Sequence, residues 1–424
     1  MQLVEPARTL NVAGDFDLIV CGAGPAGVAA AVTAGRSGLR VLLVESQGCL
    51  GGIWTSGLLC LVLDGTGKCG LVEEIGERLE AAGARRPRSQ RADFLYDPET
   101  MKVLLEDLCN EAGVHMRLHT RVVAAIREDG LLRAIVTESP SGREAFTAPL
   151  FVDSTGNGDL AAYAQCAYDH GHPVSGKTQP ATLFAIISGV PKEISGTRAE
   201  GDKERFRAML NSVGIDPSYQ SPSLFPLPHP ELHCLMINHE YDVRCDSADE
   251  ITQATVRARK ELYLTVQALR KLPAWDDARL VATAAHIGLR EGRRVRGLYH
   301  VTADDVVAGR RFGDGVCLVR FGVDVHALER SAVTGYANHG LRSKPYHIPY
   351  RALVARDLSN LALAGRCISG DFFAHASYRV TGNAVPMGEA VGLAASMARA
   401  TTVGFHAVDG ETVSKEMRAR GYEL

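Results

Sequence analysis

The sequence carries little net charge and has no apolar run long enough to cross a bilayer. Its 424 residues have a formal charge of −3 at pH 7. The sequence therefore lacks the excess of basic residues that would attract nucleic acid or an anionic membrane. The opening residues 1–14 also lack the apolar segment of a signal peptide. We expect a cytoplasmic protein with no membrane span and no nucleic-acid partner.

The ten cysteines are scattered, with no C-x-x-C pair and no His/Cys spacing typical of a metal site. Several, such as Cys21 and Cys317, stand in apolar runs, where a free cysteine behaves as a small core residue. Reduced thiols fit a cytoplasmic compartment, and no metal is expected. Internal repeats and low-complexity tracts are absent too. The length is sufficient for two domains with a large core.

Residues 17–45 form the most informative stretch. A short apolar strand at 17–21 leads into the turn Gly-Ala-Gly-Pro-Ala-Gly at 22–27, and an alanine-rich helix and a second apolar strand follow. The second strand ends on Glu45, 21 residues beyond Gly24. Strand, G-x-G-x-x-G turn, helix, strand and acid together are typical of a dinucleotide-binding site.

Each part of this pattern has a physical role. Gly22 permits the tight turn, Gly24 lets a pyrophosphate approach the backbone, and Gly27 lets the helix pack closely. The helix N-terminus offers unpaired N–H groups to the phosphates. Glu45 is placed to bind ribose hydroxyls, which argues against a 2′-phosphate.

Two later segments are expected to return to this site. A buried strand at 146–152 delivers Asp153 and Gly156 to its carboxyl end. A second buried strand at 361–364 precedes a turn at Gly365 and a helix over 383–400. The N-terminus of that helix, near Val385, is suited to stabilise negative charge on a flavin. Gly388 lets the helix pack tightly.

The remaining pattern divides the chain into three parts. Amphipathic helices are predicted at 71–82 and 98–112, a further parallel strand at 116–119, and an antiparallel insertion at 121–126 and 132–137. Between 173 and 350 the glycine-turn units vanish, and strands at 182–187, 232–238 and 280–290 surround a helix at 248–271. We therefore predict a nucleotide-binding domain from 1–172 and 351–424, with a substrate or cap domain at 173–350.

Four arginines cluster in the segment Arg-Glu-Gly-Arg-Arg-Val-Arg-Gly, residues 290–297. On a strand, Arg290, Arg294 and Arg296 would share one face. Two interpretations stay open at this point. The guanidinium groups bind a substrate carboxylate or flavin oxygen by paired bonds, or they form ion pairs with acids such as Glu291 and Asp305.

Taken together, these motifs make the chain resemble the FAD-dependent oxidoreductases related to succinate dehydrogenase and fumarate reductase flavoproteins, nearest to a poorly assigned bacterial branch. The motifs are the glycine turn through Glu45 with Gly51-Gly52 behind it, Asp-Ser-Thr-Gly-Asn-Gly-Asp at 153–159, the arginine segment, and residues 363–380. The resemblance implies an α/β fold: a Rossmann-type FAD-binding domain with a glutathione-reductase-like parallel sheet, plus an α+β substrate or cap domain. It also nominates residues for FAD, which with their neighbours are Gly22, Gly24, Pro25, Ala26, Gly27, Glu45, Ser46, Gly51, Gly52, Val122, Asp153, Gly156, Asp159, Gly365, Arg366, Val385 and Gly388.

The sequence departs from this family's pattern in two places. Gly292 stands where many relatives have a serine in the arginine motif. The His-Thr segment that carries covalent flavin in succinate dehydrogenases is not visible after Glu45. Non-covalent FAD is therefore expected, and dicarboxylate chemistry is not supported. Cys49 leaves two possibilities open, an inert thiol or a covalent attachment point.

The function expected is hydride transfer between a small polar organic substrate (an alcohol, amine or sugar-like molecule) and flavin N5. The resemblance nominates Arg290, His375 and Arg379 for the substrate side. We interpret His375 as a general base and the two arginines as anion or oxyanion anchors. An equally open interpretation has His375 bonding the flavin or the core, and Tyr378 and His286 are weaker candidates for the base. The final electron acceptor (oxygen, a quinone or a partner protein) and the oligomeric state stay open.

Three alternatives remain at this point. The enzyme reduces an activated C=C bond, it is a flavin monooxygenase, or it is a flavin-bearing protein that modifies or senses RNA. The sequence has no clear second nucleotide site for NAD(P)H, which counts against the monooxygenase. The negative net charge counts against RNA.

Overall fold

The computed structural model describes residues 3–4, 6–87, 92–194, 196–197, 199–330 and 334–424. Its centre is a five-stranded parallel sheet in the order β22-β11-β2-β3-β7. Every residue of β2, β3, β11 and β22 is buried, as expected for parallel strands covered on both faces. The strands are β2 Leu18–Cys21, β3 Val41–Val44, β7 His115–Arg117, β11 Leu150–Asp153 and β22 Leu361–Leu363.

The register of this sheet places three loops at one edge. Asp153 of β11 pairs with Cys21 of β2 on one side and with Leu363 of β22 on the other. The chain therefore leaves all three strands at the same carboxyl edge, where ligands of such sheets bind. This confirms the predicted α/β fold with its Rossmann-type sheet.

Two long helices pack against each other beside the sheet. The first is α1, Pro25–Arg36, and the second is α9, Thr381–Thr401. A Cβ added to Gly388 would lie 2.1 Å from the carbonyl oxygen of Ala26. One added to Gly392 would lie 2.7 Å from that of Ala30. These contacts confirm that small residues let the C-terminal helix pack tightly, although it begins two residues before the predicted start.

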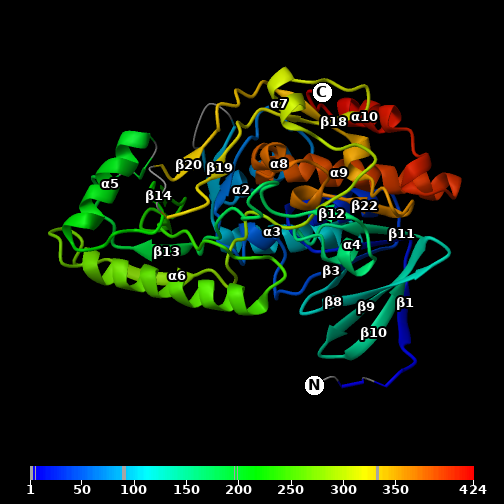
Figure 1. Cartoon of the computed structure of the whole chain (residues 1–424), viewed down its shortest axis with the longest axis horizontal. Coiled ribbons are helices and arrows are strands. Elements are labelled where there is room, and N and C mark those ends of the chain that lie inside the picture. Colours follow the sequence, from blue (N-terminus) through cyan, green and yellow to red (C-terminus); the bar gives the residue numbers. More distant parts are fainter. Residues whose placement is uncertain (1–2, 5, 88–91, 195, 198, 331–333) are drawn as a thin grey trace.

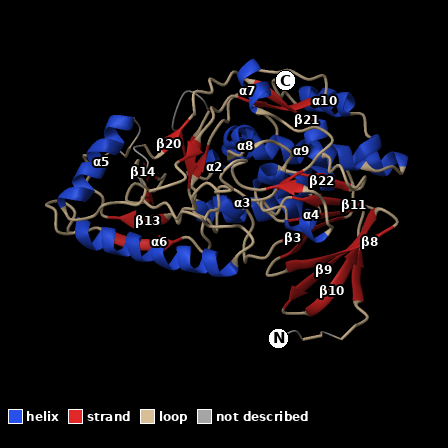
Figure 2. Ribbon diagram, in the orientation of Figure 1, coloured by secondary structure: helices blue, strands red, loops and turns tan. Residues whose placement is uncertain are grey.

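A second sheet lies to one side, at the lower right of Figure 2, in the order β1-β10-β9-β8. The antiparallel insertion was expected, but β1 was not, because the first predicted strand begins at residue 17. It pairs in parallel with β10. The strands are β1 Asn11–Asp15, β8 Arg121–Glu128, β9 Leu131–Ser139 and β10 Gly142–Thr147.

The middle of the chain builds a separate layer, drawn in green at the left of Figure 1. Its antiparallel sheet has the order β14-β15-β13-β16, and α6, Ala248–Leu269, packs on it. The predicted long helix and the strands predicted at 182–187 and 232–238 are confirmed with shifted bounds, while α5, Glu200–Ser212, and the strand β14 were missed. The strands are β13 Ala185–Ser188, β14 Ser223–Pro226, β15 His233–Met236 and β16 Arg279–Thr283.

The predicted strand over 280–290 was wrong in its second half. β16 ends at Thr283, and the next strand, β17, comprises only Arg294–Val295 and pairs with β12, Tyr168–Asp169. The chain between them follows an irregular path, so the arginines do not alternate across a strand. Their partners differ accordingly, as described below.

The remaining elements are short or cover the parallel sheet. α2, Leu71–Ala81, and α3, Pro98–Glu111, agree with the two predicted amphipathic helices, and the side chain of Asp97 caps α3 by accepting from the N–H of Thr100 at 2.8 Å. In the described residues, no helix is both long and apolar enough to span a bilayer. The other elements are α4 Asp159–Tyr163, α7 Ala303–Ala308, α8 Phe372–Tyr378, α10 Gly410–Ala419, β4 Leu61–Val62, β5 Arg85–Pro87, β6 Phe94–Tyr96, β18 Gly315–Val319, β19 Val325–His326, β20 Tyr336–Ala337, β21 Tyr346–Pro349 and four 3₁₀ turns at Gly52–Trp54, Tyr350–Leu353, Gly365–Cys367 and Phe405–Ala407.

A buried carboxyl on α9 predicts a pH-dependent stability. Glu389 is 1% exposed, accepts from the N–H of Leu71 at 3.2 Å and is bonded by the hydroxyl of Tyr422. Burial raises its pKa from 4.5 to about 7. Because the folded-state pKa is the higher one, the stability contributed by the neutral carboxyl is full below about pH 4.5 and is lost as the pH rises through 7.

We expect Glu389→Gln to be more stable than the natural protein at pH 8, by about 3.5 kcal/mol, since the pKa rises from 4.5 to about 7 and each pKa unit corresponds to about 1.4 kcal/mol, and to differ little from it at pH 5. Urea unfolding at the two pH values measures this difference. The exposed Glu411→Gln change is the control, expected within about 0.5 kcal/mol at both. Parallel pH curves for Glu389→Gln and the natural protein would contradict the assignment.

Candidate cofactor and substrate site

A cavity of about 870 Å³ opens at the carboxyl edge of the central sheet. Three distant parts of the chain form its walls: the glycine turn after β2, residues 154–157 and 159 after β11, and residues 364–366 after β22. Sequence motifs predicted this convergence. The cavity therefore lies where a doubly wound sheet binds its nucleotide.

The glycine turn is shaped by contacts on one side and open space on the other. Gly22 has a φ of 94°, and a Cβ there would lie 2.6 Å from the carbonyl oxygen of Ser154. A Cβ on Gly27 would lie 1.9 Å from the carbonyl oxygen of Gly22. A Cβ on Gly24, by contrast, would meet no atom of the described residues within 4 Å. Gly22 and Gly27 are thus required by the fold, while Gly24 leaves room for a ligand at the N-terminus of α1.

Glu45 lines the cavity and also holds the turn in place. One carboxylate oxygen accepts from the N–H of Ala23 at 2.8 Å. The other accepts from the N–H of Gln47 at 2.9 Å and from the hydroxyl of Ser46 at 3.1 Å. The acid expected to bind a ribose therefore ties the end of β3 to the glycine turn.

Asp153 supports the wall from behind. One carboxyl oxygen accepts from the N–H and the hydroxyl of Thr155, at 3.0 and 2.8 Å. The other accepts from the N–H of Ala161 at 2.8 Å. The side chain has no exposure, and burial raises its pKa to about 6. Asp153 does not line the cavity but fixes the loop that does.

Arg366 closes the wall between the second and third segments. Its guanidinium donates to the carbonyl oxygen of Gly156 at 2.9 Å, to that of Leu289 at 2.6 Å and to the side-chain oxygen of Asn157 at 2.5 Å. It thereby joins the parallel sheet's loops to the middle part of the chain. Burial lowers its pKa.

The predicted FAD residues fall into two groups. Gly27, Gly51, Asp153, Val385 and Gly388 lie outside the wall, and the α9 residues that reach it are Thr381 and Ala384, because the helix begins earlier than expected. Cys49 is not in the wall either; its thiol lies 3.7 Å from the hydroxyl oxygen of Thr55. The predicted residues that line the cavity are Gly22, Gly24, Pro25, Ala26, Glu45, Ser46, Gly52, Val122, Gly156, Asp159, Gly365 and Arg366.

Sequence reasoning missed the part of the wall that comes from the middle of the chain. This part has no fingerprint spacing, because α6 and the irregular chain after β16 reach the cavity only through tertiary packing. Its residues are Ile251, Thr252, Thr255, Val256, Arg259, Ala285, Ile287, Gly288 and Leu289. His286, a weaker candidate for the base, also lines the cavity, and burial lowers its pKa to about 4.

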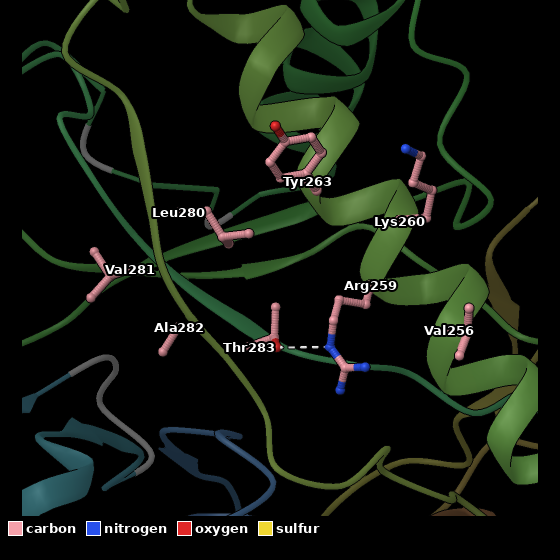
Figure 3. A pocket seen from close by; sticks show the side chains of 8 residues that line it. All are labelled: Val256, Arg259, Lys260, Tyr263, Leu280, Val281, Ala282 and Thr283. Carbon is pink, nitrogen blue, oxygen red and sulfur yellow. Dashed lines mark hydrogen bonds between the residues drawn. The ribbon is translucent and has the colours of Figure 1, made fainter.

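A shallow groove of about 500 Å³ lies between α6 and β16, next to the cavity. Figure 3 shows α6 along one side of it and β16 along the other, with Arg259 donating to the hydroxyl of Thr283 at 3.2 Å. Val256 and Arg259 line both the groove and the cavity. The two hollows are therefore neighbours across these side chains.

Arg379 and Arg290 lie close together near the cavity but in different settings. Arg379 lines it, donating to the backbone oxygen of Asp324 at 3.0 Å and to the side-chain oxygen of Gln179 at 3.3 Å. Arg290 lies outside the wall and donates to the carbonyl oxygen of Pro180 at 2.7 Å. Burial and the charge of Arg379 lower the pKa of Arg290 to about 10.

The other arginines of the segment are committed to ion pairs. Arg294 pairs with Glu291 in the interior, and Arg293 pairs with Asp159 at 2.8 Å. Arg296 bonds Asp169 at 2.7 Å, whereas Asp305 pairs with Arg310. Ion pairing with Glu291 is thus confirmed. Arg290 differs, since no carboxylate of the described residues lies within 4.0 Å of it.

His375 lies in α8, where the sequence spacing placed it four residues before Arg379. Its side chain has no exposure and does not line the cavity. Its ring stands edge-on to Tyr378 at 5.5 Å, and the backbone of Arg366 is the hydrogen-bonding group that acts on it. Burial lowers its pKa well below the usual value.

Comparisons with known proteins agree with this architecture. A family model described as FAD dependent oxidoreductase matches residues 17–417. A digeranylgeranylglycerophospholipid reductase of Methanosphaerula palustris is 31% identical over 137 residues, which cover 28% of this chain and 33% of that enzyme. The alignment thus spans about a third of that relative.

Two solved structures have similar folds. A geranylgeranyl bacteriochlorophyll reductase-like protein of Thermoplasma acidophilum superposes with a TM-score of 0.50 at 12% identity, covering 96% of this chain and 84% of that one. A triple mutant of a flavin-dependent brominase gives 0.50 at 13% identity, covering 95% and 84%. At these identities the likeness concerns the fold alone.

The chain belongs to the FAD-dependent oxidoreductase family. It is an oxidoreductase, and FAD is its cofactor. The site agrees with this cofactor, because Gly24 leaves open space at the helix N-terminus and three loops enclose one elongated cavity beside it.

We expect Asp153→Asn to weaken FAD binding about tenfold or more while the protein stays folded. An amide can replace only one accepting oxygen, so one of the bonds to Thr155 or Ala161 is lost and the loop loosens. Flavin fluorescence titration of the apoprotein measures the affinity. The control is Asp409→Asn, which takes one accepting oxygen from the cap of α10 by the same chemistry away from the cavity. Equal FAD affinity in both variants would contradict the supporting role of Asp153.

Proposed function

We propose that this protein transfers a hydride between a small polar organic substrate and flavin N5, and that the substrate carries an anionic group. The observation that supports this most directly is the pair Arg290 and Arg379. Two guanidinium groups lie near the cavity with one carboxylate, Asp324, close to both. Such a pair is complementary to a substrate carboxylate or oxyanion.

The bonds made by the two arginines support this role. Within the described residues, Nε of Arg379 has no partner although it is buried. Arg290 reaches neutral acceptors, and the partner of its outer nitrogen among the described residues is the sulfur of Met236 at 4.0 Å. Buried donors without acceptors destabilise a protein by about 1–3 kcal/mol each. A bound anion removes that penalty.

Bound FAD supplies the acceptor for the hydride at its N5 atom. The chain's own residues hold the substrate and exclude water. Arg379 belongs to the wall, so an anion that it binds lies inside the cavity. The surrounding residues Ile53, Gly288 and Leu289 add apolar or uncharged surface. An alcohol, an amine or a sugar that also carries a carboxylate meets these requirements.

The experiment that tests this proposal is an anaerobic screen for bleaching of the flavin absorbance. Glycolate, lactate, malate, alanine, proline and gluconate form the anionic set, and ethanol, glycerol and glucose form the neutral set. We expect bleaching by members of the anionic set only. Bleaching by no member of either set would overturn the proposed hydride donor class.

We expect Arg290→Met to raise the half-saturating concentration of an anionic donor about 100-fold while FAD content is unchanged. Loss of a charge-assisted bond contributes about 1.5–3 kcal/mol, and Arg290 is not in the wall of the FAD cavity. Stopped-flow reduction across donor concentrations gives the value. Arg356→Met, which removes an exposed partner of Asp357, is the control. An unchanged half-saturation would remove Arg290 from the substrate site.

For His375 we propose a structural role in the core beneath α8, in place of the general base suggested by the sequence. The charges that act on its buried ring are those of three guanidinium groups, Arg294, Arg379 and Arg366, so a proton taken up by this ring would be strongly opposed. His375→Ala is expected to unfold at lower urea concentration, since it leaves a cavity, and to keep its flavin reduction rate within about threefold. Loss of flavin reduction with FAD retained would restore the base assignment.

A second candidate function is reduction of a C=C bond, which the likeness to a digeranylgeranylglycerophospholipid reductase favours. Anaerobic addition of enoates or isoprenoid alkenes to the photoreduced protein separates the two, since reoxidation of the flavin by an alkene would support the reductase. Kinship with the succinate dehydrogenase and fumarate reductase flavoproteins, in particular, stays a prediction. The domain boundaries at 172 and 350 also stay predictions.

A further inference from the structure

Three side chains that carried no signal in the sequence form a continuous chain of contacts near the two arginines. They are Asp324, which precedes β19, His326 within β19, and His239, which follows β15. Oδ2 of Asp324 lies 3.2 Å from Nε2 of His326. Nδ1 of His326 lies 3.0 Å from Nε2 of His239. His239 is 2% exposed and His326 is 6% exposed.

The contacts determine where the protons lie. Burial and the charge of Arg290 lower the pKa of His326 to about 4 and that of His239 well below its usual value, so both rings are neutral at pH 7. A neutral imidazole has one N–H and one lone pair. Since a carboxylate only accepts, His326 carries its proton on Nε2. Its Nδ1 is then an acceptor, so His239 donates from Nε2 and has its lone pair on Nδ1.

That lone pair has no donor. Among the described residues, Nδ1 of His239 makes no hydrogen bond although it is buried. The ring stacks on Tyr219 at 4.0 Å, stands edge-on to Tyr241 at 5.8 Å, and its backbone N–H donates to the hydroxyl of Ser218. A basic nitrogen in this position is suited to receive a proton from a ligand.

The charged groups around Asp324, His326 and His239 make the surroundings of these three side chains cationic. The charges of Arg290 and Arg379 lower the pKa of both His239 and His326, whereas the carboxylate of Asp324 opposes this effect at His326. Arg379 lies 3.5 Å from Oδ2 of Asp324. Tyr219 and Tyr336 face the ring of His326. Glu291 also acts on Arg379, but it is already paired with Arg294. With both imidazoles neutral, the two guanidinium groups of Arg290 and Arg379 are left with one carboxylate, Asp324. One positive charge remains for a ligand anion to neutralise.

We propose that this cluster binds a hydroxy acid or amino acid, with the carboxylate between Arg290 and Arg379 and the adjacent O–H or N–H donating to Nδ1 of His239. The proposal rests on the proposed function and names the substrate class and the base. As the hydride leaves the substrate carbon for N5 of the bound flavin, the O–H or N–H proton passes to His239. The carbon–oxygen or carbon–nitrogen double bond forms, so two electrons and two hydrogens leave the substrate. His326, backed by Asp324, stabilises the positive charge on His239.

His286, a histidine of the cavity wall, has fewer of these features. His286 lines the cavity, yet within the described residues no carboxylate bonds it, and Arg366 is the charge that acts on it. A proton on its ring would therefore be opposed by a cation with no anion beside it. His239 is the better acceptor because Asp324 lies at the far end of its chain.

The first test needs no substrate. Long-range ¹H–¹⁵N spectra of the FAD-loaded protein, labelled at histidine, report which ring nitrogen carries the proton, and His239→Gln and His326→Gln assign the signals. We expect the Nε2–H form for both rings at pH 7. A proton on Nδ1 of His239, or a doubly protonated His239, would overturn the proposal.

The second test is stopped-flow flavin reduction by lactate and alanine, with the other four anions of the screen as further donors. We expect His239→Gln to slow reduction about 100-fold or more, which is the usual contribution of a general base, with FAD content unchanged. His233→Gln is the matched control, a buried histidine of β15 whose Nδ1 is also unpaired among the described residues but on which Arg86, and not the Arg290 and Arg379 pair, acts. It should stay within about threefold of the natural protein.

The outcomes separate the two proposals. If no anion reduces the natural protein, the proposed function fails, and the tautomer spectra still decide on the proton chain. If anions reduce the natural protein and His239→Gln equally fast, the proposed function stands and the role of His239 is overturned. A His239→Gln protein that does not fold leaves the decision to the spectra of the natural protein.

Discussion

The close approach of α1 and α9 is the contact on which the site depends. The backbone of α9 meets that of α1 where Gly388 and Gly392 have no side chains, at distances that a Cβ would not permit. This contact joins the beginning of the nucleotide fold to the last quarter of the chain. Because α9 follows directly on α8 and Arg379, its position relative to α1 also sets the position of Arg379 relative to the glycine turn. A shift of this helix pair would move both the cofactor wall and the substrate anchor.

The sequence predicted the nucleotide half of the protein well because that half is encoded by local signals. Apolar runs for strands β2, β3, β11 and β22, and glycines where the backbone must turn or approach a ligand, are all short-range patterns. Their convergence followed from the rule that parallel strands present their carboxyl ends at one edge. Even here, Asp153 and Gly388 were assigned to the cofactor although they act behind the wall. A motif identifies a residue's neighbourhood but not which of its neighbours it contacts.

The substrate side could not be predicted in the same way. Its wall is assembled from α6, the irregular chain after β16 and the end of α8, and no spacing in the sequence links these segments. The strand predicted over 280–290 was wrong in its second half, so the alternation that grouped the arginines did not apply. Arg294 instead pairs with Glu291, three residues away, and Arg290 turns to the 180–182 segment. His239 and His326 are separated by 87 residues and meet only in the folded chain.

Electrostatics connects the two halves. The wall of the cavity carries Glu45 and Asp159 together with Arg121, Arg259, Arg366 and Arg379, and Asp159 is already paired with Arg293. Glu45 lies at the end of β3, whereas Arg379 lies at the end of α8, next to the unpaired positive charge shared with Arg290 and Asp324. A ribose hydroxyl donates to a carboxylate, and an anion is attracted to guanidinium groups, so Glu45 and Arg379 favour different ligands at different places along the wall.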